Sequence, residues 1–319
     1  MTDTPENTGP TRAGFAAVIG APNAGKSTLT NRLVGAKVSI VTQKVQTTRF
    51  PVRGVALEGE AQIVLVDTPG IFKPRRRLDR AMVRSAWAGA EEAEVVVHLV
   101  DVQAELAVQD GGASGADKKA AEDVQSIVDG LKGANRKAIL ALNKIDGVKR
   151  ERLLAVAKGL FDTGVYDEVF MISAATGAGV DDLKARLAVL MPLGPWLYPE
   201  DQTADLPIRL LAAEITREKL YLRVHEELPY AANVETTAFQ ERPDGSVRIE
   251  QTILVERDGQ RAIVIGANGQ TLKWIGKASR EELTDLLERK VHLFLHVKVR
   301  ETWAEERGSY EGLGLDFDV

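Results

Sequence analysis

Residues Gly14–Ser27 read GFAAVIGAPNAGKS, and this stretch determines which fold the chain can adopt. Its first half is an apolar run typical of a buried strand, and the segment KSTLTNRLVG that starts at Lys26 has helical period. Between them, Gly20–Ser27 satisfies the pattern GxxxxGK[ST]. In such a strand–turn–helix context the glycines let backbone N–H groups converge on phosphate oxygens, and the helix N-terminus favours an anion. The stretch therefore predicts a phosphate-binding loop in an α/β fold.

Apolar runs and amphipathic segments continue to alternate as far as Met191. After GFAAVIG, the candidate strands are AQIVLVD, EVVVHLVD, KAILALN and EVFMIS, and VDDLKARLAVL has helical period. This alternation predicts a mostly parallel sheet covered by helices, the α/β class of P-loop NTPases. Ligands of such sheets bind beyond the carboxyl ends of the strands.

Composition excludes several classes of protein. The 319 residues are 44% hydrophobic and 27% charged, with no cysteine, which rules out a disulfide scaffold, thiolate metal sites and cysteine nucleophiles. A net charge of −5 gives no whole-molecule attraction to nucleic acid or anionic lipid, so such a partner must meet a local patch. No apolar run approaches the roughly 18 residues of a membrane span, and the start MTDTPENTGP lacks the features of a signal peptide. We expect a cytoplasmic protein.

The chain divides at a proline-rich stretch, PLGPWLYPEDQTADLP, that has no regular period. Beyond it the pattern becomes α+β, with a helical segment, a hairpin around Asp244 and Gly245, and AIVIGANGQTLKWIG as a strand, glycine turn and helix. The Gly/Ala/Asp-rich segment 103–119 and the tail are expected to be mobile surface segments. The predicted parts are a disordered N-terminus (1–12), a first domain (13–191), a linker (192–206), a second domain (207–307) and a C-terminal tail (308–319).

Three short motifs end successive candidate strands after the phosphate loop. They are DTPG from Asp67, NKID from Asn143 and SAATG from Ser173. The Asp146 carboxylate can accept hydrogen bonds from the N1–H and exocyclic amine of guanine, a donor pair that adenine lacks, and the Ala174 N–H is placed to donate to the guanine O6. Each motif alone is weak or moderate, but four in order at four strand ends are typical of a P-loop GTPase.

The phosphate end of this site needs a cation and an oxygen-rich metal site. Lys26 reaches the β- and γ-phosphates, and the Gly70 N–H meets the γ-phosphate. Ser27 and Asp67 supply oxygen atoms for Mg²⁺, and either Thr47 or Thr48 closes over the metal, with the spacing of QTTR favouring Thr48. The predicted catalytic residues are Lys26, Thr48 and Gly70, the predicted magnesium ligands are Ser27, Thr48 and Asp67, and the predicted nucleotide-binding residues are Gly20, Ala21, Pro22, Asn23, Ala24, Gly25, Lys26, Ser27, Thr28, Asp67, Thr68, Pro69, Gly70, Ile71, Asn143, Lys144, Ile145, Asp146, Ser173, Ala174 and Ala175.

Two positions bear on how hydrolysis proceeds. Many GTPases place a water-orienting glutamine directly after the DxxG glycine, where this chain has Ile71, so hydrolysis uses another element or is slow. Asn23 resembles the asparagine by which some of these GTPases hold a potassium ion against the phosphates. It is equally well explained as a simple loop former.

The second domain carries a GxxG turn, GANG, from Gly266 to Gly269. In KH domains this turn brings backbone close to single-stranded RNA, although a lone GxxG is a weak signal. A short strip around it is locally basic and could follow a phosphate backbone, or could simply be a solvated helix face. The predicted RNA-binding residues are Ile265, Gly266, Ala267, Asn268, Gly269, Lys273, Lys277 and Arg280.

Taken together, the GTPase motifs, the linker and the GxxG domain resemble the Era family of bacterial ribosome-assembly GTPases. The stretches that carry the resemblance are GAPNAGKST, QTTR, DTPGIFKP, NKID, LYPEDQ, VHEELPY and VIGANGQTLKWIG, and only Gln103–Lys118 looks longer and richer in Gly and Ala than the family pattern. The resemblance implies a Ras-like GTPase domain joined to a type II KH domain, hydrolysis of GTP to GDP, and binding to the 3′ region of 16S rRNA during maturation of the 30S ribosomal subunit. It also implies a peripheral association with the inner membrane, and we expect a monomer.

Two other functions fit parts of the sequence. The second domain could be a protein- or membrane-docking surface that the GTPase domain switches, an interpretation that loss of RNA binding on substituting the GxxG glycines would contradict. A metabolic P-loop ATPase is the third possibility, and NKID argues against it because Asp146 rejects adenine.

Overall fold

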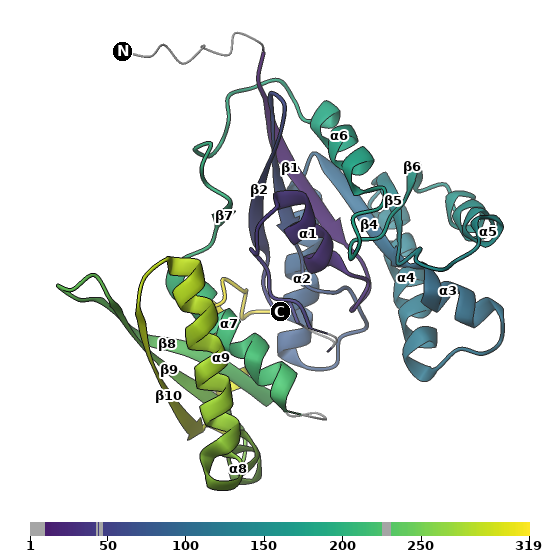
Figure 1. Ribbon diagram of the computed structural model, residues 1–319. Coiled ribbons are helices and arrows are strands. Elements are labelled where there is room, and N and C mark those ends of the chain that lie inside the picture. Colours follow the sequence, from purple (N-terminus) through teal and green to yellow (C-terminus); the bar gives the residue numbers. More distant parts are fainter. Residues whose placement is uncertain (1–9, 43, 45–46, 225–230) are drawn as a thin grey trace, which may run out of the picture. The chain divides into compact units, whose positions relative to one another are not determined.

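The apolar runs between residues 12 and 171 and a short strand at 204–205 form one seven-stranded sheet (Figure 1). The computed structural model describes residues 10–42, 44, 47–224 and 231–319. Strand order is β6-β5-β4-β1-β3-β2-β7; β1 pairs in parallel with β3 and β4, and β4, β5 and β6 continue the parallel pairing, whereas β2 is antiparallel to β3 and β7 to β2. The strands are β1 (Arg12–Ile19), β2 (Val52–Glu58), β3 (Ala61–Asp67), β4 (Val95–Asp101), β5 (Ala138–Asn143), β6 (Tyr166–Met171) and β7 (Ala204–Asp205). The predicted α/β class and all five predicted strands of this part are confirmed.

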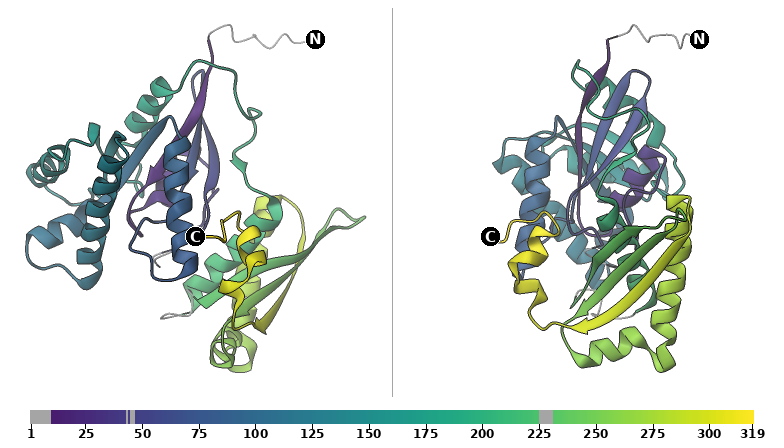
Figure 2. Two further views of the ribbon diagram at one scale, coloured as in Figure 1. Left: turned by 180° about the vertical axis from the view of Figure 1, so that it is seen from behind. Right: turned by 90° about the vertical axis from the view of Figure 1, so that its left-hand side faces the viewer.

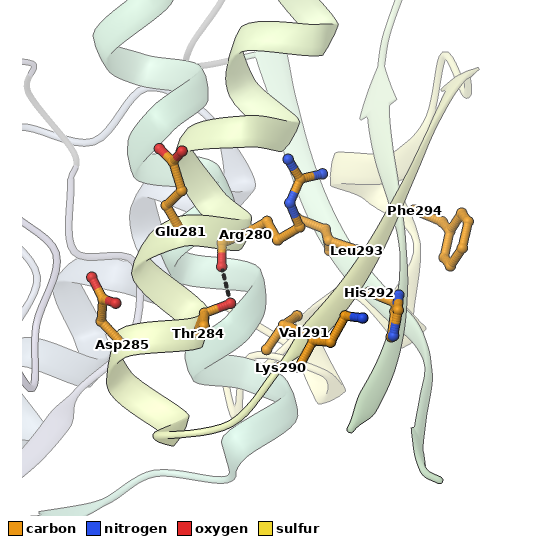
Figure 3. A pocket seen from close by; sticks show the side chains of 9 residues that line it. All are labelled: Arg280, Glu281, Thr284, Asp285, Lys290, Val291, His292, Leu293 and Phe294. Carbon is orange, nitrogen blue, oxygen red and sulfur yellow. Dashed lines mark hydrogen bonds between the residues drawn. The ribbon is translucent and has the colours of Figure 1, made fainter. Parts of the chain in front are cut away.

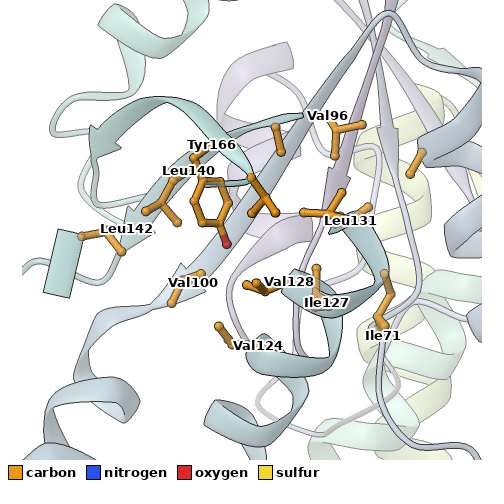
Figure 4. Packing of buried hydrophobic residues seen from close by; sticks show 14 of the residues in the cluster. Ile71, Val96, Val100, Val124, Ile127, Val128, Leu131, Leu140, Leu142 and Tyr166 are labelled. Carbon is orange, nitrogen blue, oxygen red and sulfur yellow. The ribbon is translucent and has the colours of Figure 1, made fainter. Parts of the chain in front are cut away.

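Helices cover both faces of this sheet, so the first unit has three layers. The apolar side chains of α1 and α6 pack on one face, and those of α2, α4 and α5 pack on the other. Figure 4 shows the second of these clusters, in which Val96, Val100 and Leu140 of the strands face Ile127 and Leu131 of α4. The helices are α1 (Lys26–Val34), α2 (Arg77–Glu92), α3 (Val102–Gln109), α4 (Gly115–Gly133), α5 (Arg150–Phe161) and α6 (Val180–Leu190). Because both faces are buried, the central strands read as continuous apolar runs.

The second unit is a three-stranded sheet with helices packed on it (Figure 2). Strand β9 lies in the middle, antiparallel to β8 and parallel to β10. Its elements are α7 (Ile208–Arg223), β8 (Ala232–Glu241), β9 (Val247–Val255), α8 (Asp258–Ile265), the 3₁₀ turn η2 (Ala267–Gly269), α9 (Gln270–Leu287), β10 (Val291–Val299), η3 (Trp303–Glu305) and α10 (Arg307–Glu311). The contacts between residues divide the chain into two compact units. The first comprises residues 1–39, 48–75 and 82–205, and the second comprises residues 40–47, 76–81 and 206–319.

Three sequence expectations are wrong. AIVI, expected as a strand, belongs to α8, because the Gln260 side chain accepts hydrogen bonds from the backbone N–H groups of Glu256 and Arg257 and starts a helix there. Segment 103–119, expected to be mobile, forms most of α3 and the start of α4. The tail is also ordered, since Tyr310 is fully buried and donates to the Ala304 carbonyl at 2.6 Å.

Two predicted features fall partly outside the described residues. These are the disordered N-terminus, of which residues 1–9 are not described, and the stretch VHEELPY, of which only Val224 is described. Among the helices that the structure describes, none is both long enough and apolar enough to cross a bilayer.

Candidate nucleotide site and RNA-binding surface

The phosphate loop lies between β1 and α1, as its sequence predicts. Gly25 has a φ of 101°, and a Cβ there would lie 2.4 Å from the Asn143 side-chain nitrogen, so the turn requires glycine at this position. Asn23 is exposed and also left-handed, with a φ of 63°. The loop therefore curls tightly enough to direct successive backbone N–H groups toward a bound anion.

Lys26 is buried within this loop. Its ammonium donates to the backbone carbonyls of Gly20 at 3.2 Å and Ala21 at 3.0 Å. Burial lowers the pKa of Lys26 to about 8, against the attraction of the nearby Asp67 and Asp123 carboxylates. The side chain thus stays a cation at neutral pH, in a place where a phosphate chain would meet it.

Three oxygen-bearing side chains meet next to Lys26. The hydroxyl oxygens of Ser27 and Thr48 are 2.9 Å apart, and the Thr48 hydroxyl donates to Asp67 Oδ2 at 3.4 Å. Asp67 is fully buried; burial raises its pKa, and the neighbouring Ser27 hydroxyl and Lys26 ammonium act in the opposite direction. Its Oδ1 atom is buried without a hydrogen-bond partner among the described residues.

This cluster fits a magnesium ion. Two hydroxyls and a carboxylate with one unused oxygen are the hard donors that Mg²⁺ prefers. The structure also separates the two candidate threonines, because Thr47 donates to the Lys44 carbonyl at 2.7 Å while Thr48 joins Ser27 and Asp67.

Asn143 connects the guanine end of the site to the phosphate loop. Its amide nitrogen donates to the Ala24 carbonyl at 2.7 Å, and its side-chain oxygen accepts from the Ala174 N–H at 2.9 Å. The Ala174 N–H, expected to face the guanine O6, is therefore committed to Asn143 in this structure. The Ser173 hydroxyl donates to Asp146 Oδ2 at 2.9 Å. This hydrogen bond joins the loops after β5 and β6 at Asp146, the residue predicted to recognise guanine.

Ile71 is held away from the phosphate region. Its backbone N–H donates to the Gly20 carbonyl at 3.1 Å, but its side chain is 4% exposed and belongs to the apolar cluster that includes Ile127 (Figure 4). The next residue, Phe72, lies under the Lys119 ammonium, 5.7 Å from the ring centroid. The segment after Gly70 is thus anchored on α4.

The structure brings the predicted nucleotide residues to one end of the sheet. Loops 20–28, 67–71 and 143–146 follow the carboxyl ends of β1, β3 and β5, and loop 173–175 follows β6. Asp101 and Gln103, which sequence reasoning missed, contact the 143–146 loop from the start of α3. The Asp that ends the EVVVHLVD run was the available signal for the first of these.

In the second unit, the GxxG turn lies between two helices. Gly266 has a φ of 71°, and a Cβ there would lie 2.3 Å from the Thr271 hydroxyl. Ala267 and Asn268 at the tip are exposed, as are Lys273, Lys277 and Arg280, which follow on one face of α9 at helical spacing. All eight predicted RNA-binding residues therefore lie on or beside this turn and along α9.

A groove of about 770 Å³ lies between α9 and the edge strand β10. Figure 3 shows Arg280 extending from α9 toward β10, whereas the Phe294 ring points from β10 away from α9. The lining holds the basic Arg280 and Lys290 and the acidic Glu281 and Asp285. Phe294 is 43% exposed, and the Arg248 guanidinium lies 4.9 Å from its ring centroid. Sequence reasoning missed the β10 residues, although the alternation of VHLFLHVKVR places His292, Phe294 and His296 on one face.

Comparison with protein families gives two matches. A family described as 50S ribosome-binding GTPase matches residues 15–144, and the KH domain family matches residues 227–304. The first match covers the phosphate loop, DTPG and the start of NKID, and the second covers the GxxG unit.

Individual relatives match over the whole chain. GTPase Era of Caulobacter vibrioides is 78% identical over 319 residues, all of both chains, and GTPase Era of Maricaulis maris is 59% identical over the same span. Two solved structures have a TM-score of 0.83 and 36% identity, covering 95% of this chain and 99% of theirs. One is a single-residue variant of Aquifex aeolicus Era bound to GDP·AlF4⁻, and the other is Era with MgGDPNP and nucleotides 1506–1542 of 16S ribosomal RNA.

Proposed function

The chain is a GTPase of the Era family, and from that premise we propose that it binds the 3′ region of 16S rRNA through its KH domain and assists maturation of the 30S subunit. The observation that carries this proposal is the exposed tip of the GxxG turn, followed on one face of α9 by the exposed Lys273, Lys277 and Arg280. The turn offers backbone to phosphates, and the basic side chains that follow it on α9 offer positive charge to the same strand. A solved relative was captured with nucleotides 1506–1542 of 16S rRNA.

Hydrolysis of GTP relies on electrostatic positioning. Lys26 supplies positive charge where negative charge gathers on the β- and γ-phosphates, and the N-terminus of α1 adds favourable potential. We assign Ser27, Thr48 and Asp67 to hold Mg²⁺, which neutralises phosphate charge when bound. Asp146 selects guanine by accepting two hydrogen bonds from its edge. Burial of Ile71 excludes that side chain from orienting the attacking water.

We assign a potassium ion to Asn23, whose exposed amide lies in the phosphate loop and offers an oxygen ligand. Such an ion supplies the positive charge that an arginine finger provides in other GTPases. Turnover should be at least about tenfold faster in potassium chloride than in sodium chloride of equal ionic strength, and Asn23→Ala should remove the difference. Equal wild-type rates in the two salts would show that Asn23 is only a loop residue.

RNA binding is tested with a labelled 3′-terminal fragment of 16S rRNA and fluorescence anisotropy. The double variant Lys273→Ala/Arg280→Ala should weaken binding by about tenfold or more while GTP turnover is unchanged, because two positive charges next to the RNA backbone are lost. Arg209→Ala is the matched control, since Arg209 contacts β8 at the opposite edge of the sheet. Undiminished binding by the double variant would favour a protein- or membrane-docking role for this domain.

We further propose that the protein is a cytoplasmic monomer that associates peripherally with the inner membrane. Its net charge of −5 opposes adsorption to anionic lipid, so the association would depend on salt and be reversible. Light scattering tests whether the protein is a monomer, and fractionation of cells in low and high salt tests where it is located.

We also propose the domain limits 13–191 and 207–307, with a linker at 192–206.

A further inference from the structure

The loop that reads guanine is supported on a side that the motifs do not reveal. The composition of segment 103–119 predicts mobility, yet residues 102–109 form α3 directly after β4. Asp101 caps this helix, because its Oδ1 accepts the backbone N–H groups of Gln103 at 3.0 Å and Ala104 at 3.4 Å. The start of α3 is therefore fixed relative to the sheet.

The side chain of Gln103 bridges from this helix to the NKID loop. Its amide nitrogen donates to the Lys144 carbonyl at 3.0 Å and approaches the Asp146 carbonyl at 3.5 Å. Lys144 has a φ of 62°, in the left-handed region that residues with a Cβ atom adopt uncommonly and that surrounding contacts must therefore support. The Gln103 side-chain amide thus contacts two carbonyl groups of the NKID loop, at the point where the backbone of the loop turns.

Asp101 reinforces the same loop through its other oxygen. Oδ2 accepts from the Lys144 ammonium at 2.5 Å, with the side chains of Asp101 and Lys144 19% and 37% exposed. The Asp101 carboxylate therefore orients both α3, which carries Gln103, and Lys144, which lies two residues before Asp146. The Asp146 side chain is in turn held by Ser173, which follows β6.

We propose that Gln103 is a positioning residue for guanine recognition, acting through Asp146, with Asp101 fixing the helix from which it reaches. The inference rests on the proposed reading of guanine by Asp146. By holding the Lys144 and Asp146 carbonyls, the Gln103 amide sets where the Asp146 carboxylate points. Gln103 itself has no contact with the base and takes no part in hydrolysis.

The test compares dissociation constants for GTP and ITP, measured by displacement of a fluorescent GDP analogue from the full-length protein. ITP lacks the exocyclic amine, so the ratio of the two constants reports how well the second hydrogen bond of Asp146 is made. For Gln103→Ala we expect the GTP constant to rise about fivefold, within the range for one lost hydrogen bond, and the ratio to fall toward one. The kcat at saturating GTP should stay within about twofold of wild type.

Two further variants separate positioning from a structural effect. Gln103→Glu keeps the length but replaces donors by acceptors facing two carbonyls, so it should lose discrimination more than Gln103→Ala. Gln125→Ala is the matched control, since Gln125 is an exposed glutamine that donates to Asp129 on α4 at 2.9 Å, and it should leave both constants unchanged. Thermal unfolding midpoints of all variants should lie close together.

A double-mutant cycle completes the test. In an Asp146→Asn background, Gln103→Ala should cause no further change in the ratio, because the group it positions is already altered. Wild-type discrimination in Gln103→Ala, or an additive effect in the double variant, would overturn the inference. If wild type itself does not prefer GTP to ITP, the proposed role of Asp146 fails instead.

Discussion

At the scale of single residues, the proposed selection of guanine rests on the two carboxylate oxygens of Asp146. The Asp146 carboxylate offers two acceptors, and Ser173 holds one of them in place. In Asp146→Asn one acceptor becomes an amide donor, which faces the guanine amine unfavourably but suits the 2-oxo group of xanthine. We therefore expect the KM for GTP to rise at least about 100-fold, the effect of losing charged hydrogen bonds, and XTP to become the better substrate.

Steady-state hydrolysis of GTP and XTP by wild type and variant checks this exchange. Asp182→Asn is a suitable control, because Asp182 is an exposed aspartate on α6 that belongs to none of the nucleotide motifs. If the variant loses GTP hydrolysis without gaining XTP hydrolysis, Asp146 stabilises the loop and does not recognise the base.

At the scale of elements, five of the seven strands of the first unit were predictable, and β2, β7 and several helices were not. Strands buried on both faces show as continuous apolar runs, and their motifs lie at the ends where parallel sheets bind ligands. The β-branched run AIVI instead belongs to a helix because Gln260 starts one, a side-chain effect that periodicity does not carry. Helix α3 likewise depends on a cap from Asp101 in a stretch that reads as polar and glycine-rich.

The same contrast holds for the site. The motifs predict residues that the structure brings to one end of the sheet, because each motif is local in sequence and ends a strand. The contacts that position them were not predictable, since Gln103 meets Lys144 and Asn143 meets Ala174 only after the sheet has formed. In the second unit the glycine turn is visible in the sequence, whereas Arg280 and Lys290 line one groove only because α9 packs beside β10.

Helix α4 anchors the segment after Gly70, and one of its side chains titrates near neutrality. Asp123 is 4% exposed and accepts a hydrogen bond from the Lys73 backbone. Burial raises its pKa to about 6; Lys119 on the same helix and Lys26 oppose the rise, and Glu122 adds to it. Because the folded state holds this proton more tightly than the unfolded chain, the contribution is most stabilising at low pH and is lost as pH rises from about 4 through 6.

Asp123→Asn removes this titration while keeping an oxygen for the Lys73 N–H. Between pH 5 and pH 7.5, the free energy of unfolding of the variant should gain about 1 kcal/mol relative to wild type. Urea unfolding at the two pH values measures the difference, with Asp129→Asn, an exposed acid on the same helix, as control. If the difference in free energy of unfolding between variant and wild type is the same at both pH values, the Asp123 carboxyl does not titrate in this range.

At the scale of the whole molecule, charge decides how RNA can be bound. The net charge of −5 means that the protein as a whole repels a polyanion, so the proposed RNA contact relies on the local strip of Lys273, Lys277 and Arg280. Each phosphate neutralised on single-stranded RNA contributes about 0.7 to the slope of log K against log salt concentration, so three contacts predict a slope of about −2. Anisotropy titrations from about 50 to 300 mM potassium chloride measure this slope, and Lys273→Ala should reduce its magnitude by about 0.7. A slope of about −5 or steeper would require cations beyond α9 and would move the RNA path away from the groove beside β10.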